Sequence, residues 1–220
     1  MVLKLYAPAL PIGGALLVAV ILNELNIEFE VIQLDLHPQV QEQKGDEFLR
    51  MQPFGQVPVI DDDGFILYES RAICRYLVSK YTPRGVPSLL PCPSNIEASA
   101  MFEQAASVEY GNFEPHARRV YIEGSLKPRW NIPADQKLLE AAAISLDSTL
   151  DVYEKILGKQ RYLAGNELTL VDFFHFSFGP GLLSAGYEGL CTQKRPNVKR
   201  WWAEMSARPT YCKYGDGWVA

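Results

Sequence analysis

Residues 54–73 read FGQVPVIDDDGFILYESRAI, and this stretch decides the fold of the chain. Two short apolar runs flank an acidic turn that ends in glycine, which is typical of a β-hairpin. Apolar residues then recur at helical spacing, so a helix is expected to begin near Glu69 and Ser70. Because proline cannot donate to a β-ladder, Pro58 indicates a cis peptide bond that turns the backbone of Val57 towards a ligand. The free N–H groups of the helix start would hold a carboxylate, and the stretch therefore predicts a site for a small peptide-like ligand.

The composition of the 220-residue chain is that of a folded, acidic protein. Hydrophobic residues make up 48% of it and the net charge is −5. A sizeable core is therefore expected, while the lack of any basic run argues against nucleic acid as a partner. The cysteines lie far apart without a C-x-x-C pair, which predicts free thiols in a reducing compartment. They are Cys74, Cys92, Cys191 and Cys212.

The apolar run at residues 13–22 is short for a membrane span, which needs about 20 residues. A strand-like segment precedes it, and no cleavage pattern of small residues follows it, which argues against a signal peptide. We therefore expect a buried helix, no membrane partner and a cytoplasmic location.

The order of elements predicts a thioredoxin-like β-α-β-α-β-β-α domain over residues 1–82. Strands expected at 2–6 and 28–36 flank a helix at 13–25, and the short crossover makes the two strands parallel. A short helix at 46–49 then leads to the hairpin and to the helix that completes the domain.

Residues 83–93 are rich in proline and are expected to form a linker. Beyond it, residues 94–220 are predicted to form an all-helical domain, so that the fold class is α/β followed by all-α. The helices expected there are 94–123, which opens with a capping box, 134–157, one that opens with the capping box at 169–172, and 196–207, ended by Pro209.

Further motifs lie in the second half of the chain. Residues 108–115 read VEYGNFEP, residues 162–172 read YLAGNELTLVD, and residues 195–209 begin RPNV and end ARP. Together with residues 54–73, these motifs resemble the cytosolic glutathione transferase family, most closely its phi class and related fungal members. The resemblance covers nearly the whole chain and implies that glutathione is bound in the first domain.

Carried over to this sequence, the resemblance implies a role for each part of the signature. Val57, beside cis-Pro58, would pair its backbone with the cysteinyl unit of glutathione. Glu69 would meet the γ-glutamyl ammonium, and Ser70 would hold the α-carboxylate. The other implied positions are Gln43 and Lys44, which meet the glycine carboxylate, and Gln56, which lines the site.

The hydroxyl that activates the thiol in phi-type relatives is missing here. Its position falls on Pro11 or Ile12, and no serine, threonine or cysteine occurs in the first 69 residues. Three alternatives remain open. Backbone N–H groups of Ile12, Gly13 or Gly14 would stabilise the thiolate, the hydroxyl of Tyr6 would do so, or the site binds glutathione without activating it.

An apolar electrophile is the expected second substrate. Its candidate wall residues are Leu10, Ile12, Phe113, His116 and Phe178, with Arg119 and Tyr121 as weaker candidates. No histidine pair has metal-ligand spacing, so no metal is expected, and the acidic turn at 61–63 is interpreted as solvated.

These features predict a glutathione-dependent enzyme that acts by conjugation or by reversible thiol addition with cis/trans isomerisation. A specialised biosynthetic role in secondary metabolism, or detoxification, is expected. The alternative is a non-catalytic glutathione-binding carrier or regulatory protein. The resemblance also implies a homodimer.

Overall fold

The computed structural model describes residues 2–83, 88–214 and 217–218. The chain forms two compact units, one made of residues 1–87 together with 209–220, and the other of residues 88–208. This division differs from the predicted domain boundaries, which kept residues 94–220 together. The reason is that residues 209–212 pack on helix α1 of the first unit.

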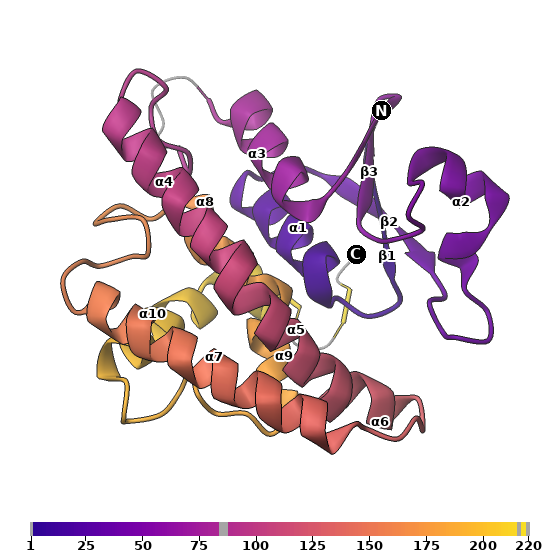
Figure 1. The fold of residues 1–220 in the computed structure, drawn as a ribbon. Helices are drawn as coiled ribbons and strands as arrows, with labels where there is room; N and C mark the ends of the chain where they lie inside the picture. Colours follow the sequence, from indigo (N-terminus) through magenta and orange to yellow (C-terminus); the bar gives the residue numbers. More distant parts are fainter. Residues whose placement is uncertain (1, 84–87, 215–216, 219–220) are drawn as a thin grey trace. The chain divides into compact units, whose positions relative to one another are not determined.

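The first unit is built on a four-stranded sheet with the order β2-β1-β3-β4. Strands β1 and β2 are parallel, whereas β1–β3 and β3–β4 are antiparallel, as the thioredoxin-like prediction requires. Helices α1 and α3 lie together on one side of the sheet, and α2 lies on the other side (Figure 1). The bounds are β1 Leu3–Pro8, α1 Gly13–Glu24, β2 Phe29–Leu34, α2 Asp46–Met51, β3 Val59–Asp62, β4 Phe65–Tyr68 and α3 Ser70–Tyr81.

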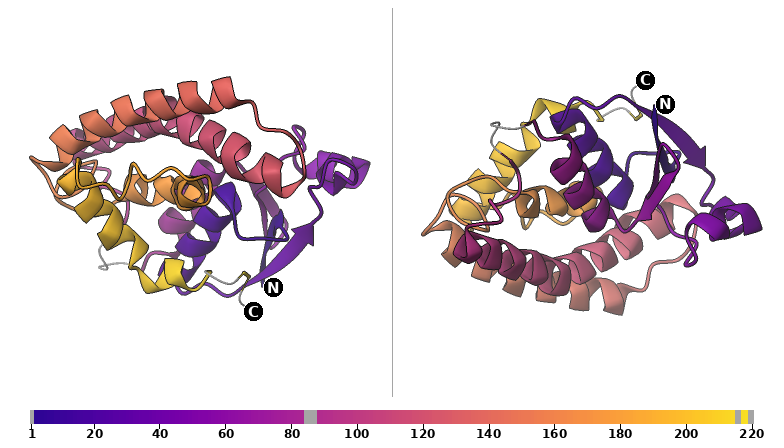
Figure 2. Two further views of the ribbon diagram at one scale, coloured as in Figure 1. Left: turned by 90° about the horizontal axis from the view of Figure 1, so that it is seen from below. Right: turned by 90° about the horizontal axis from the view of Figure 1, so that it is seen from above.

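Helix α1 is the centre of this unit. Residues 15–22 are all buried, which confirms the expected buried helix. A helix that is apolar all round has to be covered on every side. Here the sheet, α3 and the short helix α11 (Pro209–Cys212) provide that cover, and Figure 2 shows the yellow C-terminal segment beside the indigo α1.

The acidic turn of the hairpin is not fully solvated, because Asp62 is only 8% exposed. Its carboxylate accepts hydrogen bonds from Lys80 Nζ at 2.7 Å, Tyr76 OH at 2.7 Å and Tyr81 OH at 2.8 Å. Burial alone would raise the pKa of Asp62, but these donors hold it below the usual value of 3.8. The expectation of a solvated turn is therefore wrong for this residue, which connects β3 to α3.

The second unit begins with one long helical stretch. It comprises α4 (Ile96–Val108), α5 (Glu114–Tyr121) and α6 (Lys127–Arg129), joined by π-helical turns at Glu109–Phe113 and Ile122–Leu126. The side chain of Asn95 caps its first turn, one residue later than the predicted capping box begins. Helix α7 (Gln136–Leu157) runs beside this stretch (Figures 1 and 2).

The rest of the second unit packs around an aromatic core. The predicted capping box is confirmed, since Thr169 and Asp172 bond reciprocally at the start of α8. Asp172 is fully buried and also accepts from Leu163 N and Trp201 Nε1. Burial raises its pKa to about 6, against the opposing effect of these bonds. The remaining helices are α8 Leu170–Phe174, a 3-10 turn at His175–Ser177, α9 Gly179–Ser184 and α10 Pro196–Ser206.

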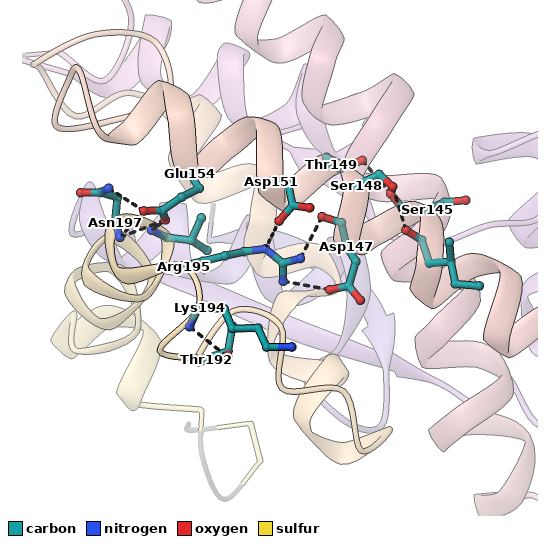
Figure 3. A network of polar contacts seen from close by, with 12 residues as sticks. Ser145, Asp147, Ser148, Thr149, Asp151, Glu154, Thr192, Lys194, Arg195 and Asn197 are labelled. Carbon is teal, nitrogen blue, oxygen red and sulfur yellow. Dashed lines mark hydrogen bonds and ion pairs between the residues drawn. The ribbon is translucent and has the colours of Figure 1, made fainter.

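Polar contacts join α7 to the start of α10 (Figure 3). Arg195 donates to Asp147 at 2.8 Å and to Asp151 at 2.7 Å. The carboxylate of Glu154 accepts from the backbone amides of Asn197 and Val198, both at 3.0 Å. A helix of this unit therefore supplies the N-terminal cap of another.

Candidate functional site

The start of α1, the start of α3 and Pro58 meet at Gly14. A Cβ atom on Gly14 would lie 2.9 Å from Ser70 Cβ, 3.0 Å from Ser70 Oγ and 3.0 Å from Pro58 Cδ. Real side chains essentially never approach this closely, so the three segments can meet only because residue 14 has no side chain. Three residues that are far apart in the sequence are thereby brought to one point.

The peptide bond between Val57 and Pro58 is cis, as predicted. Strand β3 begins only at Val59, and its pairings with β1 and β4 start there. The N–H and C=O of Val57 therefore lie outside the ladder, next to the point where Gly14 and Ser70 meet. A peptide-like ligand can pair with this backbone as a further strand would.

Glu69 and Ser70 form the start of α3. Glu69 has φ 69° and ψ 105°, a conformation that an L-residue adopts only where its surroundings impose it. No side chain caps α3 and no acidic residue lies in its first turn. The first amides of a helix have no acceptor within it, so this start suits a carboxylate, with the hydroxyl of Ser70 beside it and the exposed carboxylate of Glu69 one residue away.

The loop that precedes Val57 is hydrogen-bonded to Lys44. Lys44 Nζ donates to the carbonyl of Phe54 at 2.7 Å, which leaves two of its protons for a ligand. Gly55 has φ 58°, and a Cβ there would lie 2.6 Å from Lys44 Cδ. Gln43 Oε1 is buried without a hydrogen-bond partner in the described part of the chain, and Gln56 is exposed on the same loop. A cation and amide groups thus lie together, as a ligand carboxylate requires.

The start of α1 offers backbone donors rather than side-chain donors. Ile12 occupies the N-cap position in an extended conformation, and no side chain caps the helix. Gly13 has φ 61°, the left-handed region that favours glycine. The amides of the first turn have no acceptor within the helix, and its dipole places a partial positive charge there. This arrangement suits an anion such as a thiolate.

Tyr6 is packed within the first unit. It lies on β1 opposite Val59 of β3, and its ring meets Phe48 of α2 edge-on at 6.1 Å between centroids. Phe48 itself is 4% exposed. The ring of Tyr6 is thus part of the packing between α2 and the sheet, which favours a structural role over thiol activation.

The candidate residues for an electrophile differ sharply in exposure. Leu10 is 45% exposed on the loop after β1. Phe113 is 1% exposed, and its ring lies 4.5 Å from that of His175 and 6.2 Å from that of Tyr153. Phe113 is therefore a core residue of the second unit, whereas Leu10 is accessible.

The other candidates lie on α5 and before α9. His116 and Phe178 are both half-buried, and the ring of Phe178 lies 6.1 Å from that of Tyr121. Tyr121 is buried, its hydroxyl has no hydrogen-bond partner within the described residues, and burial raises its pKa. Arg119 instead pairs with the buried Glu123 at 3.4 Å. The weaker candidate Tyr121 thus has a free polar atom, and Arg119 is engaged in an ion pair.

One neighbour of the site was missed by the sequence reasoning. Trp218 Nε1 donates to the carbonyl of Pro8, the last residue of β1, at 2.8 Å. A single tryptophan near the end of the sequence carries no pattern that would place it there.

Neither the cysteines nor any metal-ligating cluster forms a second centre among the residues that the structure describes. None of the four cysteines forms a disulfide, and burial raises the pKa of the Cys74 thiol to about 12. Over the described ranges, no group of three or more histidine, cysteine, aspartate or glutamate residues has the arrangement of a metal site. Nor does any described helix have the length and apolar character that crossing a membrane demands.

Both units match models of known protein families. Residues 1–79 match the family model described as Glutathione S-transferase, N-terminal domain, and residues 104–209 match Glutathione S-transferase, C-terminal domain. The chain belongs to the glutathione S-transferase family. The resemblance to its phi class and related fungal members is thereby confirmed.

Individual relatives of this glutathione transferase cover almost its entire length. Glutathione S-transferase hmp2 of Hypomyces subiculosus is 40% identical over 214 residues, which is 97% of each chain. Glutathione S-transferase 3 of Zea mays is 38% identical over 96% of this chain and 92% of its own. The crystal structure of glutathione transferase F2 from Populus trichocarpa superposes with a TM-score of 0.87 at 36% identity, covering 96% of each chain. A glutathione S-transferase I bound with lactoylglutathione gives 0.85 at 30% identity, over 97% of this chain and 98% of the other.

Proposed function

We propose that this chain is a glutathione-dependent transferase in which backbone amides at the start of α1 activate the thiol. The observation that carries the proposal is the contact of Gly14 with Ser70 and Pro58. This contact brings the backbone donors of α1 next to Ser70 and Pro58, beside which the γ-glutamyl and cysteinyl parts of glutathione would bind.

Each charge of glutathione has a complementary group in the first unit. The start of α3 at Ser70 suits the α-carboxylate, and Glu69 suits the neighbouring ammonium. Lys44 and Gln43 suit the glycine carboxylate, while the free backbone of Val57 suits the cysteinyl unit. Hydrogen bonds to charged groups contribute about 1.5–3 kcal/mol each, so a few of them hold a tripeptide.

The chemistry requires a thiolate, and a free thiol with a pKa of about 8.5 is only slightly ionised at neutral pH. The amides of Gly13 and Gly14 would favour the anion without any side-chain hydroxyl. Losing one preorganised donor costs about 10²–10³ in rate, and backbone amides recover part of that loss. We therefore expect slow turnover of general electrophiles and faster turnover of activated ones.

The thiolate sulfur would attack an electrophilic carbon of an apolar substrate and form a C–S bond. A leaving group then departs with the bonding electron pair, or a carbanion next to the new bond takes up a proton, and either step completes conjugation. In a conjugated alkene, rotation of the carbanion followed by expulsion of the thiolate gives the other isomer and regenerates glutathione. In the first unit, Leu10 and Ile12 are the proposed substrate contacts.

The remaining parts of the proposal rest on the family. A homodimer in the cytoplasm, with a role in detoxification or in a specialised biosynthetic step, fits a glutathione transferase whose cysteines form no disulfide. The second candidate is a glutathione-binding carrier. It is favoured by the absence of a hydroxyl in the sequence of the loop at residues 9–12.

A titration with glutathione, recording thiolate absorbance against pH, tests the proposal. We expect bound glutathione to ionise clearly below its free value. Binding without a shift in the thiol pKa would favour the carrier, and no binding at millimolar glutathione would overturn both.

A pair of glycine variants tests the location of the site. Gly14→Ala should weaken glutathione binding at least tenfold, because the new Cβ collides with Ser70 and Pro58. Gly111→Ala is the matched control, since no atom lies within 4 Å of a Cβ there and it belongs to the second unit. Equal affinities of the two variants by calorimetry would place glutathione elsewhere.

A further inference from the structure

Residues near the end of the sequence, from Thr210 to Tyr214, are bonded to the second half of α1. At the far end of the helix, Tyr214 is 7% exposed and its hydroxyl is hydrogen-bonded to Asn23 Nδ2. Lys213 Nζ donates to Asn23 Oδ1 at 3.0 Å, and the hydroxyl of Thr210 donates to Glu24. These contacts fix the segment where α1 ends.

A second attachment lies at the other end of α1, where the proposed thiol site begins. Trp218 Nε1 donates to the carbonyl of Pro8 at 2.8 Å. The Trp218 ring meets that of Tyr214 nearly perpendicularly, with 5.7 Å between centroids. The indole therefore holds the last residue of β1, directly before the loop at residues 9–12 that leads into α1.

That loop has few other means of being held by polar contacts. It reads Ala9, Leu10, Pro11 and Ile12, none of which has a polar side chain. Its position therefore depends on its backbone, on apolar packing and on the elements at its two ends. One end is the residue whose carbonyl Trp218 binds, and the other is the uncapped start of α1.

The position of this loop is important because the proposed donors to the thiolate are backbone amides. A serine side chain can rotate to follow the sulfur, whereas a backbone amide moves only with the whole loop and helix start. Stabilisation by preorganised donors depends on their placement, and a displacement of about 1 Å can cost 10²-fold in rate. A loop that carries backbone donors therefore requires an external anchor.

We propose that Trp218 is a positioning residue for thiol activation: through the carbonyl of Pro8 it fixes the loop from which the amides of α1 reach the sulfur of glutathione. The inference rests on the proposed function, because it assumes that the thiol lies at the start of α1. Trp218 acts on the rate and on the thiol pKa, while the ends of glutathione are held by other elements.

Trp218→Phe tests this role, because it keeps an aromatic ring and removes the N–H donor to Pro8. We expect kcat with an activated electrophile to fall at least fivefold. The KM for glutathione should stay within twofold, and the pKa of bound thiol should move towards its free value. Trp218→His, which retains a ring N–H, should recover part of the rate.

Tyr214→Phe is the matched control. It removes hydrogen bonds of the same segment at the far end of α1 and leaves the donor to Pro8 in place. We expect a lower melting temperature with an unchanged thiol pKa.

The outcomes separate this inference from the proposed function. If the unaltered protein lowers the thiol pKa but Trp218→Phe does so equally well, the positioning role is overturned and the proposed function stands. If Tyr214→Phe raises the thiol pKa as much as Trp218→Phe, the segment acts only through general stability, which also overturns it. Failure of the unaltered protein to bind glutathione would overturn the proposed function itself.

Discussion

Two adjacent glycines at the start of α1 are needed for different reasons. Gly13 adopts φ 61°, which costs other residues about 1–2 kcal/mol, while no atom lies within 4 Å of its missing Cβ. Gly14 has an ordinary φ, but its missing Cβ would overlap Ser70 and Pro58. The first glycine shapes the turn and the second allows close approach, so that a helix begins against the ligand site without a capping side chain.

A single substitution should restore the missing hydroxyl. In Ile12→Ser the new side chain lies at the N-cap, where it can accept from an amide of the first turn and stabilise α1 by about 0.5–2 kcal/mol. Its own proton remains available to the sulfur. We expect kcat for conjugation to rise at least tenfold, measured by stopped-flow with an activated aryl halide.

Ile12→Ala is the control for the loss of the isoleucine side chain. It should give no rise in kcat, because it adds no donor. A more stable Ile12→Ser protein without any gain in rate would show that position 12 does not face the thiol.

At the scale of elements, Asp62 determines how the hairpin and α3 hold together. Its carboxylate has three donors from α3, which hold its pKa below 3.8 in the folded state. A carboxylate with a lowered pKa stabilises the folded state above the unfolded pKa, and that stability is lost as the pH falls through the folded pKa.

Asp62→Asn should therefore destabilise the protein in a pH-dependent way. At pH 7 we expect a loss of about 1–3 kcal/mol, because the amide accepts less strongly and brings its own donor towards Lys80. Urea unfolding of both proteins at several pH values measures the difference. It should stay constant above pH 5 and shrink below about pH 4, and a difference that grows on acidification would contradict this account.

Most elements of this fold could be predicted because their signals are local. The hairpin, α1, α3 and α7 follow from apolar periodicity and turn residues within a few positions of one another. The capping box of Thr169 and Asp172 is equally local, and the structure has it where the sequence predicts it. The glutathione positions also come from a local family motif, and they stay predictions.

Features that depend on distant partners could not be predicted. Asp62 looks like a turn residue until Tyr76, Lys80 and Tyr81 come into contact with it from the following helix. The aromatic neighbours of Phe113 likewise come from other helices, so periodicity alone could not separate a core ring from a pocket wall. Long-range packing decides both cases.

At the scale of the whole molecule, the chain does not finish one unit before it starts the next. It leaves the first unit near residue 87, forms the second, and returns to the first at residue 209. The apolar α1 explains the return, because the sheet and α3 leave a side that α11 and Tyr214 cover. Burial of apolar surface contributes about 25 cal/mol per Å², so even a short segment matters for such a helix.

Removal of residues 209–220 should therefore destabilise the first unit and not the helical unit to which those residues are joined. We expect hydrogen exchange of the α1 amides to accelerate at least tenfold, whereas the amides of α7 keep their protection.

Removal of residues 215–220 alone is the matched control, since it retains Tyr214 and its bonds to Asn23 and Ala19. That shorter deletion should preserve the protection of α1 and lose the shift in the glutathione thiol pKa, because Trp218 is gone. Equal acceleration of exchange in α1 and α7 after the longer deletion would contradict the assignment of residues 209–220 to the first unit, and full protection of α1 would show that the segment does not cover it.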